Sequence, residues 1–367
     1  MKRIAILLST IVGCGEEGTQ GAGVRVWHCD GVTERKLLDV GLPPAFEGNV
    51  DFVRKSGRCQ GYAAVLTTDF TSGALSRVDL STFRVEPNLF TTHSDAVLRH
   101  IDNRLYVLNR YPMDSIQVYD TTGTGLVRVG EEFSVGDGTA NPQDICCSNR
   151  ELCYVTRLGN PAVLIVNPET GKELGAIDLS SLDTDGNPDA SSCFLAGTTL
   201  AVALQRLDAS FDPQAPGQIA FIYVATDPPS LASTLDTAAP NPFGRFHALS
   251  NSTARIAEVG SLGGVTDGFL EDIDVGNRAS LGKVLSEEEL GGDVVGFDTC
   301  ATGETWAIGA DAAGTTRLHS IDLPLGKGKG HARPAHFEAE NYRLTSIAAD
   351  PCAPGHIWVS DRNVPAE

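Results

Sequence analysis

The chain has 367 residues, of which 41% are hydrophobic and 20% are charged, and its formal net charge is −19 at pH 7. This composition is that of a globular protein with enough apolar residues for a large core. The negative charge argues against binding to duplex nucleic acid, because neutralising phosphates requires clustered Lys and Arg.

The first residues have the features of a secretory leader. A short basic start, Met-Lys-Arg, precedes an apolar run over residues 4–12. The run ends in Ile-Val-Gly-Cys, with the cysteine at Cys14, and this resembles the lipobox of bacterial lipoproteins. That resemblance implies cleavage before Cys14, attachment of diacylglycerol to its thiol, and acylation of the new amino terminus with a fatty acid such as palmitate. An ordinary signal peptide with an unrelated cysteine is the alternative.

The leader sets the expected domain organisation. We predict a signal peptide at 1–13, a flexible tether at 14–23, where the Gly-rich sequence has nothing to bury, and a single domain at 24–367. Gly15 follows Cys14, and by resemblance to the enterobacterial sorting rule this permits the outer membrane. No apolar run of about 18 residues follows the leader, so we expect membrane attachment through the lipid anchor alone.

A repeated arrangement of short strands follows. One type of strand, with apolar alternation and a polar end, recurs at 63–69, 105–110, 152–157, 200–206, 256–260, 305–311 and 357–362. Another short strand precedes each of these, at 50–53, 95–101, 143–148, 191–197, 246–251, 294–299 and 345–349. A third follows, at 75–79, 116–120, 163–167, 219–224, 269–274 and 318–322, and a fourth, such as 173–179, leads to the next repeat. The spacing of roughly 40 to 50 residues is typical of four-stranded propeller blades.

The two ends of the sequence supply the halves of one repeat. Residues 357–362 form a second strand that lacks its third strand, and residues 24–30 have the pattern of that missing strand. We therefore predict an all-β fold, a seven-bladed β-propeller closed by pairing of the N-terminal and C-terminal strands in one shared blade. Two β-sandwiches are the alternative for strands at this spacing. Deleting residues 355–367 should unfold a ring that is closed in this way.

Turn sequences favour tight hairpins between the strands. Asp120-Thr-Thr-Gly123 and Asn167-Pro-Glu-Thr-Gly171 supply the Asn, Asp and Gly that such turns need. The pattern Val-Asn-Pro-Glu-Thr-Gly-Lys resembles the YVTN/YncE-like propeller repeat, which is also similar to WD40 repeats. The resemblance covers essentially the whole chain after the leader, although it is degenerate where the loop at 205–217 is long and Pro-rich. It implies a propeller fold.

The cysteines suggest disulfides in an oxidising compartment. Nine are present, and eight remain if Cys14 is lipidated. Three pairings are expected: Cys147 with Cys153 across a hairpin turn, Cys146 with Cys193 between neighbouring innermost strands, and Cys29 with Cys352 across the closure. Buried free thiols are the alternative. No Cys-x-x-Cys occurs, so zinc or haem attachment is poorly supported.

Two groups of polar residues are candidate binding sites. Asp183, Asp185, Asn187 and Asp189 place oxygen atoms on alternate residues around a glycine, which resembles a Ca²⁺ loop, although Phe194 stands where a bidentate acid is expected. A plain loop between blades is the alternative. The second set consists of arginines at the ends of second strands, which could bind a carboxylate or phosphate at one face of the ring: Arg110, Arg157, Arg206 and Arg362. Alternatively, each pairs with a nearby acid such as Asp144 or Asp361.

These features favour a non-enzymatic protein of the bacterial cell envelope. We expect a lipid-anchored binding or scaffold propeller that recognises an envelope protein or a small anionic ligand through its loop face, without nucleic acid and without a certain cofactor. No nucleophile elbow, phosphate-binding loop or metalloprotease motif occurs. The alternatives are a metal-dependent hydrolase of the lactonase type, another propeller enzyme with its site over the central channel, or a subunit of a larger envelope complex.

Overall fold

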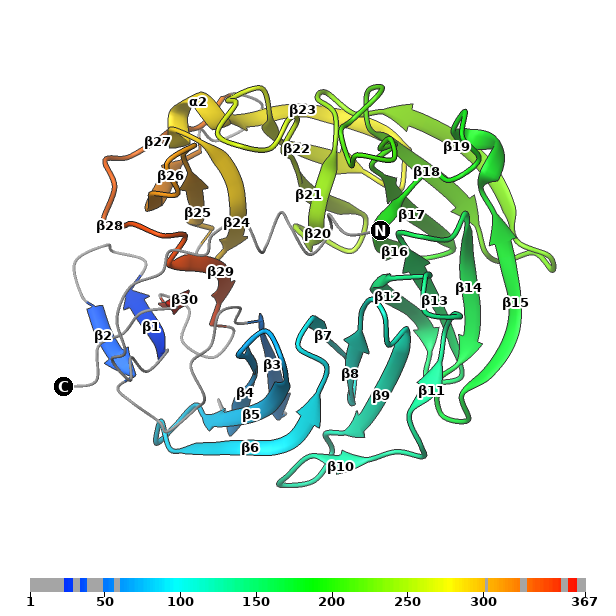
Figure 1. Ribbon diagram of the computed structural model, residues 1–367, viewed down its shortest axis with the longest axis horizontal. Helices are drawn as coiled ribbons and strands as arrows, with labels where there is room; N and C mark the ends of the chain where they lie inside the picture. The colour runs from blue at the N-terminus through cyan, green and yellow to red at the C-terminus, as the bar shows by residue number, and fades with distance from the viewer. Residues whose placement is uncertain are drawn as a thin grey trace.

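The computed structural model describes residues 23–28, 34–37, 49–55, 60–300, 303–323, 329–350 and 356–361. These residues form almost only β-structure, and the helical elements among them are η1 (Ser180–Leu182) and α2 (Glu287–Leu290). The sheets stand around a common axis, so the predicted β-propeller fold is confirmed (Figure 1). No helix within the described ranges has the length and apolar character needed to cross a membrane.

Six blades are each formed by strands that are consecutive in the chain, paired antiparallel, with the first strand nearest the axis (Figure 1). Blade 1 contains β3 (Asn49–Lys55), β4 (Gln60–Thr68), β5 (Gly73–Asp79) and β6 (Val85–Thr92), and blade 2 contains β7 (Ala96–Ile101), β8 (Arg104–Asn109), β9 (Ser115–Asp120), β10 (Val127–Arg128) and β11 (Phe133–Ser134). Blade 3 contains β12 (Pro142–Asn149), β13 (Leu152–Arg157), β14 (Ala162–Asn167) and β15 (Lys172–Asp178), and blade 4 contains β16 (Ala190–Ala196), β17 (Thr199–Leu204), β18 (Gln218–Tyr223) and β19 (Ser230–Asp236). Blade 5 contains β20 (Pro242–Ala248), β21 (Thr253–Glu258), β22 (Phe269–Asp274) and β23 (Ala279–Ser286), and blade 6 contains β24 (Asp293–Thr299), β25 (Thr305–Ala310), β26 (Thr316–Asp322), β27 (His331–Ala332) and β28 (Phe337–Ala339).

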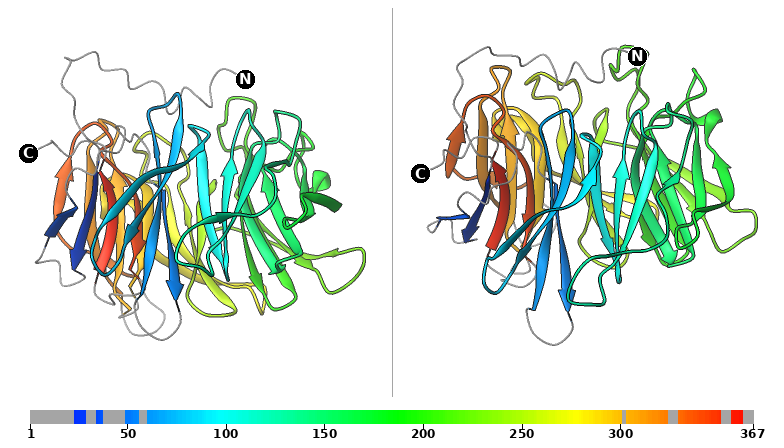
Figure 2. Two further views of the ribbon diagram at one scale, coloured as in Figure 1. Left: turned by 90° about the horizontal axis from the view of Figure 1, so that it is seen from below. Right: turned by 60° about the horizontal axis from the view of Figure 1, so that its bottom comes forward.

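One further sheet joins the two ends of the chain. Its strand order is β2 (Glu34–Leu37), β1 (Gly23–His28), β30 (His356–Asp361) and β29 (Leu344–Ala349), and we call it the closing sheet. β1 runs antiparallel to β30, with Val24 opposite Ser360 and Trp27 opposite Ile357. Figure 2 shows these strands standing side by side in two further views. Backbone hydrogen bonds between distant segments therefore complete the ring.

The prediction of a seven-bladed propeller, with one blade shared by the two ends of the chain, is wrong in its count and is corrected to six blades. Six sheets are blades of consecutive strands, whereas the closing sheet is a composite of both ends of the chain. Its described side chains, in β29 and β30, pack on both neighbours: Trp358 joins a cluster with blade 1, and Val359 joins one with blade 6. Blades 2 and 6 also depart from the four-stranded pattern, because two short strands share the outermost position where Gly and Pro interrupt the chain.

The core consists of apolar clusters between neighbouring blades. Leu105 to Leu108 in β8 are at most 1% exposed, because this strand lies in the middle of a blade that is covered on both faces. The outermost strand β19 is mostly exposed. The sequence placed the first strands of blade 5 at 246–251 and 256–260, about four and three residues too late. The register shift between Phe243 and His247 breaks the alternation that marks a strand.

Candidate functional site: two charged bridges between the inner strands

The innermost strands present one residue each at a common register. These residues lie opposite the third residue of the second strand of each sheet: Arg99, Cys146, Phe194, His247 and Phe297 in blades 2 to 6, and Ala348 in the closing sheet. Within this set, only the side chains of Arg99 and His247 carry a charge or titrate near neutral pH. They stand on strands β7 and β20, which lie on opposite sides of the ring (Figure 1).

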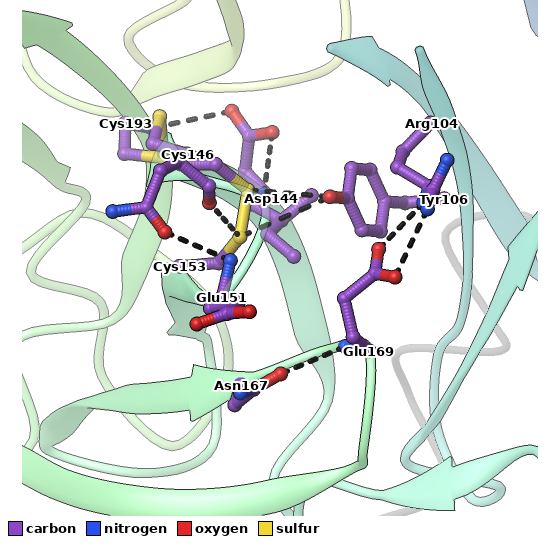
Figure 3. The surroundings of a disulfide bond; sticks show 12 residues. Arg104, Tyr106, Asp144, Cys146, Glu151, Cys153, Asn167, Glu169 and Cys193 are labelled. Carbon is purple, nitrogen blue, oxygen red and sulfur yellow. Dashed lines mark hydrogen bonds and ion pairs between the residues drawn. A yellow bond between two sulfur atoms is a disulfide. The ribbon is translucent and has the colours of Figure 1, made fainter. Parts of the chain in front are cut away.

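Arg99 belongs to a bridge across three blades. Its Nε donates to Asp144 Oδ1 at 2.5 Å, and its Nη1 donates to the carbonyl of Leu98 at 2.7 Å. The other carboxylate oxygen of Asp144 accepts from the backbone N–H of Cys193 at 3.2 Å (Figure 3). The Asp144 side chain is only 4% exposed, and its Oδ1 also accepts from the backbone N–H of Ile145 at 2.8 Å, so protein groups rather than water compensate its charge. We call this set of three residues the Arg99 bridge.

His247 belongs to a bridge of the same design. Its Nδ1 lies 3.0 Å from Asp298 Oδ1 in blade 6, and Asp298 Oδ2 accepts from the backbone N–H of Ala349 in the closing sheet at 2.8 Å. The imidazole also packs against Phe297, with 4.2 Å between the ring centroids. We call His247, Asp298 and the N–H of Ala349 the His247 bridge. In both bridges, an aspartate holds a basic side chain of the preceding blade and a backbone N–H of the following sheet.

The electrostatics make His247 a neutral hydrogen-bond donor to Asp298. Burial lowers the pKa of His247, the charges of Arg245 and Arg99 lower it further, and Asp298 opposes them. Burial alone would raise the pKa of Asp298, but His247 and the N–H of Ala349 contribute to holding it below its ordinary value. An ionised carboxylate only accepts, so Nδ1 carries the proton and Nε2 is the acceptor nitrogen of the ring.

Each bridge leaves one polar group uncommitted. Arg99 Nη2 and His247 Nε2 make no hydrogen bond with the residues that the structure describes. The two side chains keep 13% and 11% exposure, respectively. The charge of Arg99 is the smallest of the named contributions that lower the pKa of His247. The ring therefore contains an available cationic donor and an available proton acceptor.

Two disulfides surround the Arg99 bridge. Cys146 bonds to Cys193, which joins blades 3 and 4 beside Asp144, and Cys147 bonds to Cys153 across the β12–β13 hairpin. These are two of the pairings that the sequence suggested. The hydroxyl of Tyr106 lies 3.7 Å from Cys147 Sγ. Figure 3 shows Tyr106 together with Asp144, Cys146, Cys153 and Cys193. The suggested Cys29–Cys352 pairing lies outside the described residues.

The arginines named from the sequence are occupied by neighbouring groups. Arg110 Nε donates to Asp95 at 2.7 Å, and the ion pair of Arg206 with Asp183 spans 3.8 Å. Arg157 is buried and donates to Asn160 and to the carbonyls of Val135 and Ala162. Arg362 lies outside the described residues. Of the acids named as their partners, Asp144 pairs with Arg99, and Asp361 pairs with Arg343. A ligand role for these arginines stays a prediction.

The proposed calcium residues form a loop with internal hydrogen bonds. Asp185 accepts from the backbone N–H of Asn187, whose Nδ2 donates to Asp189. Burial raises the pKa of Asp189 to about 7, and the charges of Asp185 and Asp183 act in the same direction. Within the described ranges, no three His, Cys, Asp or Glu side chains come together in a metal-binding arrangement. Calcium binding by this loop stays a prediction.

Two buried glutamates fix loops around blade 5. Glu258 accepts from the N–H of Ala239 at 2.7 Å, and burial together with the carboxyl of Glu271 raises the pKa of Glu258 to about 10. Glu287 accepts from Gly268 and Val294, and burial raises its pKa to about 8. Both are protonated at neutral pH. Their role is to satisfy backbone N–H groups within the fold.

The comparisons with known proteins extend only to the fold. No protein-family model and no curated protein matches the sequence. The structure is similar to a streptogramin B lyase (TM-score 0.61, 11% identity, 93% of this chain and 96% of that one). It is also similar to a catalytically inactive Staphylococcus aureus virginiamycin B lyase with quinupristin (0.54, 11%, 86% and 99%) and to the β-propeller domain of Myceliophteria thermophila Cps50 (Swd1) (0.53, 11%, 85% and 95%). At these identities, what the chain shares with the three proteins is the β-propeller fold.

Proposed function

We propose that the protein is a binding propeller that takes a small oxyanion, such as a carboxylate or phosphate group, at the guanidinium of Arg99 on its inner strands. One observation carries this proposal: Arg99 is held through Nε and Nη1, and its Nη2 has no hydrogen-bond partner among the described residues. No other residue of this register set combines charge with an uncommitted polar atom in the described structure.

The physical case rests on the fixed position of Arg99. Asp144 and the Leu98 carbonyl hold the guanidinium through Nε and Nη1, so a ligand at Nη2 orders little additional side chain. A hydrogen bond from a guanidinium to an oxyanion is charge-assisted and stronger than a neutral one. The low exposure of the Arg99 side chain reduces screening by solvent. These terms favour a compact anion.

Isothermal titration calorimetry with acetate, succinate and inorganic phosphate tests the proposal. At least one of these probes should bind the wild-type protein, and Arg99→Gln should weaken that binding at least about tenfold, as expected for a lost charge-assisted hydrogen bond. Arg150→Gln is the matched control, because Arg150 is exposed on the β12–β13 turn. No binding of any probe, or equal binding by Arg99→Gln, would contradict the proposal.

We also propose that the protein is attached to the bacterial cell envelope, at the outer membrane, through lipidated Cys14. The support is the apolar leader that ends in Ile-Val-Gly-Cys. Mass spectrometry of the protein from a membrane fraction should show a chain that begins at Cys14 and carries acyl groups. An unmodified Met1 or a free Cys14 thiol would rule the anchor out.

A propeller enzyme is the second candidate. The pairing of His247 with Asp298 has the geometry of a general base oriented by a carboxylate, and two of the similar structures are lyases. The described residues offer no metal-binding group of the kind that a lactonase-type hydrolase needs. Incubation with quinupristin followed by liquid chromatography and mass spectrometry tests the lyase alternative. A product that forms with the wild-type protein and not with His247→Gln would favour it.

A further inference from the structure

One end of the ring carries the loops that follow the second strand of each sheet. The sheets repeat the same strand order around the ring, so their second strands all run toward this end (Figure 2). The described loops here are 69–72, 110–114, 158–161, 205–217, 259–268 and 311–315. In the closing sheet, the second strand β30 ends at Asp361, which lies opposite Gly23 at the start of β1. The amino-terminal strand therefore begins at this end of the ring, which we call the anchor face.

The anchor face exposes apolar side chains on three of its loops. Phe70 of blade 1 is 47% exposed, Met113 of blade 2 is 52% exposed, and Leu262 and Val265 of blade 5 are 38% and 50% exposed. In the loops that the structure describes, the one other large apolar side chain that is exposed is Leu249, on the β20–β21 turn at the opposite end. Strands β4, β8 and β21, which lead into the three loops, stand on different sides of the ring (Figure 1). The exposed side chains are therefore spread widely enough to meet a flat surface.

The loop of blade 5 holds its apolar side chains in a fixed conformation. Gly263 and Gly264 lie between Leu262 and Val265, and their backbone N–H groups donate to the carboxylate of Asp293 at 2.7 and 2.9 Å. Their φ angles of +106° and +79° lie in the region that glycine adopts at no steric cost. A loop that is already ordered loses little conformational freedom when a surface covers it.

The proposed lipid anchor lies close to the same end of the ring. Cys14 is nine positions before Gly23 in the sequence, so the chain can place the lipid at most about 30 Å from the start of β1. β30 has six residues and spans about 20 Å, so the opposite end of the ring is farther from the lipid by about that length. A membrane that holds Cys14 is therefore nearest to the anchor face.

We propose that the anchor face docks on the lipid surface of the membrane to which Cys14 is attached, with Phe70, Met113, Leu262 and Val265 in the headgroup region. This inference rests on the proposed lipid anchor. Burial of these side chains away from water is favourable, and the membrane interface accepts apolar groups from a peripheral protein. Because the lipid keeps the ring at a high local concentration beside the membrane, a weak contact suffices to orient it. The formal net charge of −19 makes a zwitterionic lipid surface a better partner than an anionic one.

Quenching of an introduced tryptophan by brominated lipids tests which end of the ring meets the membrane. The full-length, acylated protein is reconstituted in phosphatidylcholine vesicles, with and without bromine atoms near the headgroup end of the acyl chains. Val265→Trp should lose more fluorescence in the brominated vesicles than the wild-type protein, because its indole lies at the lipid surface. Leu249→Trp is the matched control at the opposite end, and its quenching should equal that of the wild-type protein.

A second measurement tests whether the apolar side chains make the contact. In a Met113→Trp protein, quenching should fall when Leu262 and Val265 are both replaced by serine, because blade 5 then no longer holds the ring against the lipid. Leu249→Ser should leave that quenching unchanged. All of these replacements are at exposed side chains, and thermal unfolding of each variant checks that the fold is kept.

The outcomes separate this inference from the proposed anchor. If mass spectrometry shows no acyl group on Cys14, the anchor fails and the inference fails with it. If Cys14 is acylated but Val265→Trp is quenched no more than Leu249→Trp, docking through the anchor face is overturned and the anchor stands. Unchanged quenching of Met113→Trp after the two serine replacements would overturn the role of the apolar loops.

Discussion

The Arg99 bridge and the His247 bridge each connect three neighbouring sheets, but they do so with side chains of different chemistry. Each carries a basic side chain at the same register, an aspartate of the next blade, and a backbone N–H of the sheet after that. Arg99 keeps its charge at all relevant pH values, whereas His247 can lose or gain one. Blades 2 to 4 are therefore joined by a permanent ion pair, and blades 5 and 6 and the closing sheet are joined by a titratable contact.

This difference shows which part of the ring keeps a fixed charge and which part can change its protonation state with pH. The Arg99 side is reinforced by the Cys146–Cys193 disulfide, which joins the same two blades as Asp144. On the His247 side, the contact between rings of His247 and Phe297 supplies packing. A response to pH should therefore originate in blades 5 and 6.

Replacing the aspartate of each bridge with alanine should give the largest difference in stability between the two bridges. Asp144→Ala leaves Arg99 charged and partly buried without its partner, and we expect a loss of about 3 to 5 kcal/mol in the free energy of unfolding. Asp298→Ala should cost less, about 1 to 3 kcal/mol, because His247 can remain neutral and only hydrogen bonds are lost. Denaturant unfolding of both variants gives the comparison. Equal losses would show that the charge of Arg99 adds nothing.

The contribution of each disulfide near Arg99 to stability can be measured by removing that disulfide while the ion pair is kept. The chain-entropy model gives about 4 kcal/mol for Cys146–Cys193, whose cysteines are 47 residues apart. It gives about 2 kcal/mol for Cys147–Cys153, with a separation of 6 residues. Paired Cys→Ala variants should follow this order in thermal unfolding. The reverse order would mean that local geometry outweighs loop length in this blade.

Acid should weaken the His247 bridge first. The pKa of His247 is lowered in the folded state, so below the ordinary value of about 6.5 the unfolded chain binds more protons and stability falls with falling pH. The lowered pKa of Asp298 adds a second loss at more acidic pH. His247→Gln should therefore lose less stability than the wild type between pH 7 and 5. An Arg99→Gln variant should reduce this pH dependence only slightly, because the charge of Arg99 is the smallest of the named contributions that lower the pKa of His247.

Glu258 should give an effect of the opposite sign, at alkaline pH. Its pKa is raised from 4.5 to about 10, so the folded state binds the extra proton across this window and stability falls as pH rises. Glu258→Gln keeps the shape of the side chain without titrating, and it should reduce the loss of stability between pH 7 and 9. If this variant shows the same alkaline loss as the wild type, the titration belongs to another group, such as Glu287.

The strands of the propeller could be predicted because their pattern is local. The second strands at 105–110 and 152–157 differ by one residue at most from β8 and β13. The predicted number of blades was wrong. The alternation of apolar and polar residues marks single strands, but it does not show how many sheets consist of consecutive strands. Cys147 and Cys153 could be paired because a hairpin turn separates them.

The candidate site could not be predicted by the same reasoning. Arg99 and His247 are 148 positions apart in the sequence, and neither lies in a recognisable motif. Their equivalence depends on pairing with Tyr106 and Arg255, which is a property of register rather than of local sequence. The available signal was a pair of basic residues inside a short first strand, Arg99 with His100 in β7 and Arg245 with His247 in β20, whereas the sequence pattern favoured arginines at strand ends.

The pairing of β1 with β30 has a consequence for how the protein is made. These strands lie at opposite ends of the described chain, so a ribosome delivers the first long before its neighbour exists. Until then, the early segment has an exposed edge that could pair with another copy, and the last contacts formed are among the most distant in sequence. Nascent chains of this protein should therefore depend on dilution or on chaperones until synthesis reaches the strand that shields that edge.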